Sequence, residues 1–350
     1  MPLRDKNKLF IYTPTYYKST GLQYRLSMLI KSLKENGYDV HLYVDEHETL
    51  VRGLYDRFAK YFLKYEYAWK FIGKYIAKKI LNYGPNIVFL ITDITASAIP
   101  LLKSAGINTV LFLEDLTVDW LQITGKARER ILKRLSKYVL QADLVVVPGN
   151  HFRKKICKEL GINSIVCPPG LELRVTVEEA LSRSLEKISI LHARQIVHPI
   201  EAQLLELITI KNFSNDRYVL YALKAGRYHT KVRSRNVCWY YYPTLENAIK
   251  HVKKCHIGLI ATPRVAPTFT SYWFHLSLLQ PLIAVTNRQV ERGYWIPFKE
   301  FMKKPSVIEE VVEDIVSRYR YVIENLYEYI TVKLNRESTH RELLRRLKEL

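Results

Sequence analysis

The sequence predicts an α/β protein of two domains, each built on a parallel sheet covered by helices. Short apolar strands alternate with segments of helical period along most of the 350 residues, which is the pattern of βαβ units. The alternation breaks once, over the polar residues 171–186, and then resumes. A chain of this length is comfortable for two domains, so we expect two sheets in succession.

The first half opens with a complete βαβ unit. Residues 8–14 (KLFIYTP) predict a buried strand, 21–36 predict an amphipathic helix stopped by Gly37, and 39–44 (DVHLYV) predict the next strand. A strand–helix–strand unit of this kind implies a parallel sheet. The later elements of this half continue the alternation: helices 50–83, 99–105, 125–141 and 151–160, and strands 84–91, 109–113, 143–148 and 164–167.

The second half repeats the pattern. Its predicted elements are strands 188–192, 218–223, 237–241, 256–261 and 281–285, helices 201–210 and 272–279, and charged helices over 306–330 and 339–350. We therefore expect an N-terminal domain 1–170, a linker 171–186, a C-terminal domain 187–305, and C-terminal helices 306–350 that pack back toward the N-terminal domain. A polar turn at 262–271 follows a buried strand and precedes a helix. Open α/β sheets bind ligands at such a place, where a helix N-terminus attracts phosphate.

The charge is strongly basic, with 54 Lys and Arg against 34 Asp and Glu, a net charge of +20. This favours anionic partners, namely nucleic acid, an anionic membrane or phosphorylated substrates, although a solvated basic surface gives the same composition. The four cysteines form no CxxC pair and no histidines cluster at zinc spacing, so we expect no metal and a reducing, cytoplasmic location. No signal-peptide core or membrane-spanning run is present in the sequence.

Several motifs occur in an order that resembles a known family. They are a Gly-containing first loop at 13–21, the strand in ENGYDVHLYV, the segment QADLVVVPGNHFRKKICKELGINSIVCPPGLEL, the element ISILHARQIVHP, and the stretch from 248 to 285 that ends in QPLIAV. Together they resemble the retaining group 1 (family 4-like) glycosyltransferases. The resemblance covers nearly the whole chain. It implies the GT-B fold, in which two Rossmann-like domains face each other across a cleft.

The resemblance also implies the chemistry. The C-terminal domain would bind a nucleoside diphosphate sugar as donor, with no cofactor and no metal, and the N-terminal domain would bind the acceptor. Four positions depart from the family pattern. Ala266 and Phe274 stand where the family carries two glutamates. Pro199, or its neighbour His198, stands where the family carries a lysine about five residues after Arg194, and Glu114 takes the place of a histidine in an H-D element.

Candidate donor-binding residues lie in the loops that follow strands. Arg194, which falls on the family's phosphate-binding arginine, and Arg264 would neutralise the charge that develops on the leaving diphosphate. The others could offer hydroxyls, backbone N–H groups or a neutral ring to the donor, and they are Gly21, His192, Thr268, Thr270 and Ser271. Each has a structural alternative: a surface arginine, a helix N-cap, a turn glycine or a structural histidine.

Candidate catalytic residues are Arg194 and the acidic pair Glu114 and Asp115, which follows a predicted strand of the N-terminal domain. A carboxylate there could act as general base or orient the acceptor, whereas solvated loop acids are the alternative.

The segment 51–81 combines lysines and arginines with many aromatic residues. This composition is typical of interfacial helices on anionic membranes, although a core helix with a basic face also fits. Nucleic-acid binding is less favoured, because no binding motif accompanies the segment. We therefore predict a glycosyltransferase that moves a sugar from a nucleoside diphosphate sugar to a lipid-linked or glycan acceptor, peripheral at the inner face of a membrane. The alternatives are a GT-B-fold binding or scaffold protein that has lost catalysis and, less favoured, a basic nucleic-acid-binding protein.

Overall fold

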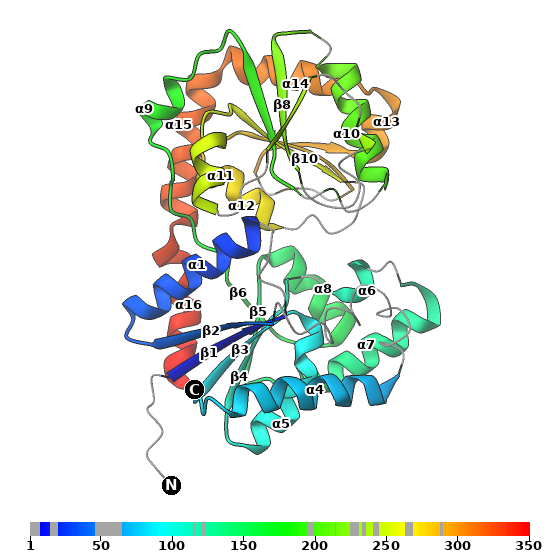
Figure 1. Cartoon of the computed structure of the whole chain (residues 1–350), viewed down its shortest axis with the longest axis vertical. Coiled ribbons are helices and arrows are strands. Elements are labelled where there is room, and N and C mark those ends of the chain that lie inside the picture. The colour runs from blue at the N-terminus through cyan, green and yellow to red at the C-terminus, as the bar shows by residue number, and fades with distance from the viewer. Residues whose placement is uncertain are drawn as a thin grey trace. The chain divides into compact units, whose positions relative to one another are not determined.

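The computed structural model describes residues 8–14, 20–45, 65–114, 116–120, 123–194, 196, 199–213, 215–224, 231–232, 236–240, 245–262, 269–287, 290 and 292–350. At 20–23, 120, 245, 248 and 269–271 it describes the backbone alone. The described residues form two compact units. The first draws on Met1–Tyr17, Leu26–Gly170 and Arg336–Leu350, and the second on Lys18–Arg25 and Leu171–Asn335. Each unit is an α/β domain with helices on both sides of its sheet (Figure 1).

The sheet of the first unit has six strands in the order β2-β1-β3-β4-β5-β6. The strands are β1 (Lys8–Thr13), β2 (Asp39–Val44), β3 (Ile87–Ile91), β4 (Asn108–Phe112), β5 (Leu144–Val147) and β6 (Ile165–Val166). Every pairing is parallel, which confirms the prediction. Because β1 has β2 on one side and β3 on the other, the strand order reverses between β1 and β3. Ligands of open α/β sheets bind at such a reversal, the topological switch point.

The helices of the first unit cover this sheet. They are α1 (Thr20–Glu35), whose first residues belong to the second unit, α4 (Glu66–Leu81), the 3-10 helix η2 (Asp93–Ala98), α5 (Ile99–Ser104), α6 (Thr117–Trp120), α7 (Gly125–Val139), α8 (Asn150–Leu160) and α16 (Arg336–Glu349). The predicted helix 50–83 is described from Glu66 onward, and its earlier part lies outside the described residues.

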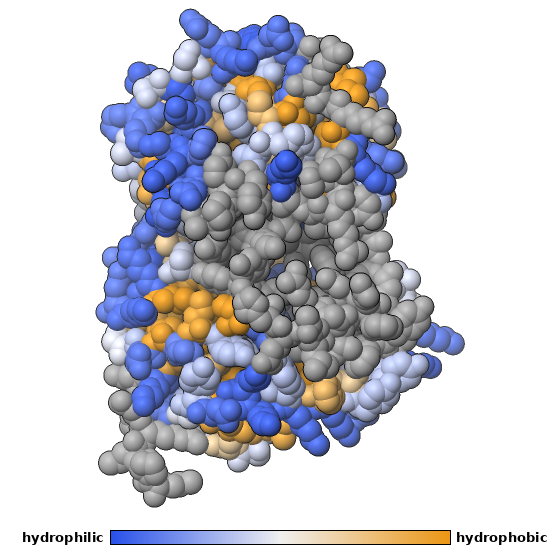
Figure 2. Space-filling view, viewed as in Figure 1, coloured by the Kyte–Doolittle hydropathy of each residue, from blue (hydrophilic) through white to orange (hydrophobic). Residues whose placement is uncertain are grey.

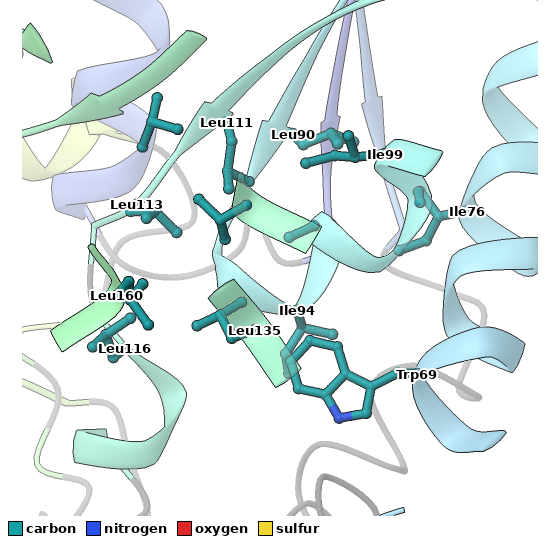
Figure 3. Packing of buried hydrophobic residues seen from close by; sticks show 14 of the residues in the cluster. Trp69, Ile76, Leu90, Ile94, Ile99, Leu111, Leu113, Leu116, Leu135 and Leu160 are labelled. Carbon is teal, nitrogen blue, oxygen red and sulfur yellow. The ribbon is translucent and has the colours of Figure 1, made fainter. Parts of the chain in front are cut away.

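Helix α4 packs against the sheet through one apolar face. Trp69, Ile72, Ile76 and Ile80 recur at helical spacing, and all are buried. Figure 3 shows Trp69 and Ile76 of this helix among the buried side chains of β3, η2 and α5. Gly73 lies on the same face, where an added Cβ would collide with the backbone carbonyl of Ser97. The close approach of α4 to η2 therefore requires glycine at this position.

The last helix, α16, returns to the first unit. His340, on α16, makes two buried hydrogen bonds. Its Nδ1 shares one with Ser32 Oγ at 2.6 Å, and its Nε2 donates the other to the carbonyl of Pro169 at 3.1 Å. Gly170, the residue after Pro169, has a φ of 69°, and a Cβ there would lie 2.9 Å from Arg336 Cα. Gly170 is thus required by the turn and by close packing. Of the helices expected to pack on the first domain, α16 belongs to the first unit, whereas residues 306–335 belong to the second.

The sheet of the second unit also has six parallel strands, in the order β12-β11-β10-β7-β8-β9. The strands are β7 (Ile188–His192), β8 (Tyr218–Leu223), β9 (Val237–Tyr240), β10 (Ile257–Thr262), β11 (Leu282–Thr286) and β12 (Tyr294–Pro297). Strand β7 pairs with β8 on one side and β10 on the other, so the switch point of this sheet lies between β7 and β10. The edge strand β12 was not predicted from the sequence.

The helices of the second unit are α9 (Val177–Leu181), α10 (Pro199–Asn212), α11 (Leu245–Val252), α12 (Phe269–Ser277), α13 (Phe298–Lys303), α14 (Val307–Ser317), α15 (Tyr319–Tyr329) and the π-helical turn η4 (Ile330–Leu334). The expected linker 171–186 is part of this unit and contains α9. Thr176 and Glu179 begin α9 with a capping box, in which each side chain accepts a hydrogen bond from the other residue's backbone N–H.

Candidate functional site

A cluster of buried polar side chains lies at the switch point of the second sheet. His192 is the last residue of β7 and Thr262 is the last residue of β10, so both stand at the carboxyl edge of the sheet, and β10 continues three residues past the level of His192. Arg194 follows β7 directly, and Glu201 reaches the same place from the first turn of α10. All four are buried. Charged and polar side chains are rarely buried without a functional or structural reason.

Arg194 and Glu201 form a buried ion pair. Arg194 Nη2 donates to Glu201 Oε1 at 3.1 Å, and Thr262 Oγ1 donates to the same oxygen at 3.1 Å. Arg194 is 8% exposed and Glu201 is 1% exposed. Arg194 was predicted as the principal cation for a diphosphate, and the structure adds that a carboxylate already compensates its charge.

His192 is held as a neutral imidazole. Burial lowers its pKa to about 3, and the nearby charges of His275 and Arg194 act in the same direction. Among the described residues neither ring nitrogen of His192 has a hydrogen-bond partner. A neutral imidazole carries one donor and one acceptor, and leaving both unused in the interior is costly. His192 therefore has hydrogen-bonding capacity available at the switch point.

Helix α12 is the element that follows β10 along the chain. Thr270 and Ser271 lie in its first turn, whereas they were expected in the polar turn before the helix, and their side chains are outside the described part of the structure. Arg264 and Thr268 lie outside the described residues altogether. The backbone N–H groups of a first helical turn and the helix dipole attract phosphate.

A buried network fixes α12 on the sheet. His275 Nδ1 donates to Gln280 Oε1 at 2.8 Å, and Gln280 Nε2 donates to the carbonyls of Val252 and Cys255. The His275 ring lies over Gly258 of β10, where an added Cβ would be 2.6 Å from the ring. The absence of a side chain at Gly258 thus sets how closely α12 approaches β10.

The first unit has its own polar group at its switch point. Asp93 follows β3, and its carboxylate accepts hydrogen bonds from the backbone N–H and the hydroxyl of Thr117, at 2.7 and 2.5 Å. Burial raises the pKa of Asp93 to about 6. The preceding residue, Thr92, has a φ of 85°, which a non-glycine residue adopts at an energetic cost. Strained backbone and perturbed carboxylates both concentrate at functional sites.

The remaining predicted residues come from the N-terminal half of the chain, and Gly21 among them belongs to the second unit. Glu114 is half-buried and follows β4, while Asp115 lies outside the described residues. Gly21, expected in a loop, lies in the first turn of α1. Among the described residues no group of three or more His, Cys, Asp or Glu side chains is arranged to hold a metal ion.

Comparison with known proteins rests on structure. No protein-family model and no curated protein sequence matches the chain. A glycosyltransferase from Rickettsia africae matches with a TM-score of 0.65 at 12% identity over 99% of this chain and 98% of that one. Sucrose-phosphate synthase from Thermosynechococcus elongatus matches with a TM-score of 0.71 at 12% identity over 98% of each chain. Anabaena HepE, solved with UDP and glucose, matches with a TM-score of 0.64 at 10% identity over 98% of this chain and 100% of that one.

The chain has the GT-B fold. The match covers both units of this GT-B protein, each a Rossmann-like domain with a parallel sheet, as the sequence predicted. Two of the predicted donor-binding residues, His192 and Arg194, stand at the switch point of its second sheet.

Sequence reasoning missed Glu201, Thr262 and Asp93. Glu201 resembles an ordinary acidic residue in the first turn of a helix, where carboxylates are common. Asp93 follows a fully buried strand directly, a position at which ligand-binding residues are frequent in parallel sheets.

Proposed function

We propose that the protein is a glycosyltransferase that moves a sugar, a hexose by family resemblance, from a nucleoside diphosphate sugar to a lipid-linked or glycan acceptor. The observation that carries this proposal is the buried cluster of His192, Arg194, Glu201 and Thr262 at the switch point of the second sheet of a GT-B protein. HepE, which shares the fold, was solved with UDP and glucose. A donor diphosphate at this edge would lie beside the first turn of α12.

The proposed reaction breaks the bond between the sugar and the diphosphate, and negative charge develops on the departing diphosphate. Arg194 and the N–H groups of the first turn of α12 would stabilise that charge without a metal ion. Arg264, Thr268, Thr270 and Ser271 remain proposed contributors to the same site. In the first unit, Glu114 or Asp115 would orient the acceptor hydroxyl or take its proton.

The test of this proposal is transfer. We expect the purified protein to release a nucleoside diphosphate from one of the common UDP-, GDP- or ADP-sugars in the presence of lipid-linked or glycan acceptors, measured by coupled detection of the released nucleotide. The charge compensation of Arg194 by Glu201 favours one alternative, a GT-B-fold binding protein without catalysis. Nucleotide binding without release of product from any acceptor would establish that alternative and contradict the transferase.

We also propose that the segment 51–81 binds an anionic membrane and so brings the protein to its acceptor. Helix α4 is the described part of this segment. On α4 the exposed residues Tyr67, Phe71, Lys74 and Lys78 form one stripe at helical spacing. Tyr67 is 65% exposed and Phe71 is 51% exposed, unusual values for large aromatic side chains. Where Figure 1 places α4, Figure 2 shows hydrophilic residues interrupted by a smaller apolar area. Aromatic and basic residues together suit the headgroup level of a bilayer.

A groove of about 400 Å³ runs between α4 and α5 beside this stripe. Lys74 and Lys78 line it together with apolar residues that include Leu81 and Leu101. Neither lysine makes an ion pair within the described part of the chain. No described helix is long and apolar enough to cross a bilayer.

We expect the protein to bind vesicles that contain anionic lipid more tightly than neutral vesicles. Reversing both charges in Lys74→Glu/Lys78→Glu should weaken this binding at least roughly thirtyfold, because each of the two basic residues at an anionic surface contributes about 1 kcal/mol. Cosedimentation with phosphatidylcholine vesicles, with and without phosphatidylglycerol, measures it. The matched control is Lys299→Glu/Lys303→Glu, an exposed pair of the same spacing on α13. Equal losses in the two variants would show that net charge alone, and not α4, governs binding.

A further inference from the structure

One carboxylate oxygen joins three elements at the switch point of the second sheet. Glu201 Oε1, from the first turn of α10, accepts from Arg194 after β7 and from Thr262 at the end of β10. These are the two strands between which the strand order reverses. A single side chain therefore ties together the three pieces of backbone that border the proposed donor site.

The ion pair between Glu201 and Arg194 is shielded from solvent. The side chain of Glu201 is 2% exposed and that of Arg194 is 9% exposed, so solvent screens neither charge effectively. Removal of one partner would leave the other as an uncompensated buried charge. The guanidinium is planar with its donors in a fixed fork, so a bond from Nη2 to a buried carboxylate also fixes the direction of the remaining donors.

We propose that Glu201 is a positioning residue for the donor: it holds Arg194 in place at the switch point and reduces the positive charge that Arg194 presents to a diphosphate. This inference rests on the proposed function. Glu201 thus has two effects. It makes diphosphate binding weaker than Arg194 alone would make it, and it keeps the arginine ordered.

Two substitutions at Glu201 separate its charge from its hydrogen bonds. In Glu201→Gln the amide oxygen can still accept from Arg194 and Thr262, but the negative charge is gone. A diphosphate would then meet a guanidinium whose charge this carboxylate no longer neutralises, and we expect its affinity to rise roughly tenfold. In Glu201→Ala the acceptor is lost as well, Arg194 is no longer held, and we expect the affinity to fall roughly tenfold. A purely structural role would weaken binding in both variants.

The experiment is isothermal titration calorimetry of UDP, GDP, ADP, CDP and TDP, and of inorganic pyrophosphate, into the full-length wild type, Glu201→Gln, Glu201→Ala and the control Glu206→Gln on the same helix. Chemical denaturation of each variant checks that the second unit is folded. Tighter binding in Glu201→Gln with weaker binding in Glu201→Ala supports the inference. Unchanged affinity in both Glu201 variants, or lower affinity in both, overturns the inference about Glu201. Binding by the wild type would still support the proposed function in either case. Absence of binding by the folded wild type would instead overturn the proposed function and, with it, the role of Glu201.

A second measurement tests the hold on Arg194 without any ligand. The stabilities of Arg194→Ala, Glu201→Ala and the double variant form a double-mutant cycle. A coupled pair predicts that the double variant loses clearly less stability than the two single losses added together. Additive losses would show that Glu201 does not hold Arg194 and would overturn the positioning role.

Discussion

Replacing Gly258 by alanine is expected to lower the stability of the second unit by about 3 kcal/mol, as overpacking of a filled interior does. The new Cβ would lie 2.6 Å from Cγ and Nδ1 of His275 and 2.9 Å from its Cβ. The ring has no room to retreat, because His275 is fully buried and bonded to Gln280. Helix α12 must therefore move away from β10, and its first turn moves with it. We expect nucleoside diphosphate binding to weaken as well.

Urea denaturation followed by hydrogen exchange of peptides from each unit measures the effect of Gly258→Ala. The matched control is Gly73→Ala, in which the added Cβ meets the carbonyl of Ser97 and should destabilise the first unit instead. The double variant Gly258→Ala/His275→Ala removes the obstructing ring and should recover part of the loss. Wild-type stability in Gly258→Ala would mean that His275 does not set the spacing between α12 and β10.

Acid is expected to unfold the second unit before the first. Three buried histidines of the second unit have lowered pKa values, first of all because burial disfavours their charged form: His192 to about 3, and His256 and His275 to about 4. In the unfolded chain a histidine titrates near pH 6.5. The unfolded state thus binds more protons as the pH falls from 6.5 toward 4, and stability is lost over that window. Each histidine contributes up to roughly 3 kcal/mol to this loss, so together they rival the stability of an ordinary domain.

The hydrogen bonds of two of these histidines agree with a neutral ring. His256 Nδ1 accepts from the backbone N–H of Ser189 at 3.0 Å, while its Nε2 lies 2.9 Å from the carbonyl of Ser184 and donates to it. A second proton on Nδ1 would remove the acceptor for Ser189. His275 uses Nδ1 to donate to Gln280, and a second proton, on Nε2, would be buried without an acceptor among the described residues.

The first unit contains a group that acts in the opposite direction. Burial raises the pKa of Asp93 to about 6, above its ordinary value of 3.8. The folded state therefore binds more protons than the unfolded state between these values, and the first unit gains stability from this group as the pH falls from 6 to 4. Hydrogen exchange of peptides from the two units, followed from pH 7 to pH 4, measures both effects. Loss of protection in the first unit ahead of the second would contradict this assignment of the histidines and Asp93.

The sequence was sufficient to predict the fold class because the signals for it are local. Each buried strand is a short apolar run, and each helix such as α4 repeats its apolar residues at helical spacing. The short helix α9 was also readable, because Thr176 and Glu179 have the spacing of a capping box, yet its polar composition suggested a linker. The edge strand β12 was missed because Tyr294–Pro297 is short and half-exposed, so its apolar pattern is weak.

The site was predictable in part for the same reason. Arg194 was identified because it falls on the phosphate-binding arginine of the family that the sequence resembles, and His192 because it ends a predicted strand; both are local properties. The role of Glu201 depends on which strands become neighbours, since its partners Arg194 and Thr262 lie on segments 7 and 61 residues away along the chain. No local pattern contains that information. Asp93 was missed for a similar reason, because its partner Thr117 lies beyond the next strand, 24 residues away.

The most direct test of the donor site at the switch point of the second sheet is a binding measurement. Titration calorimetry of UDP, GDP, ADP, CDP and TDP into the wild type, Arg194→Ala and Arg194→Lys addresses it. We expect one nucleoside diphosphate to bind the wild type, with an affinity at least tenfold lower in Arg194→Ala and partly restored in Arg194→Lys, because lysine keeps the charge but not the planar fork. Failure of every nucleotide to bind a folded wild type, or binding that Arg194→Ala leaves unchanged, would contradict a donor site at this edge of the sheet.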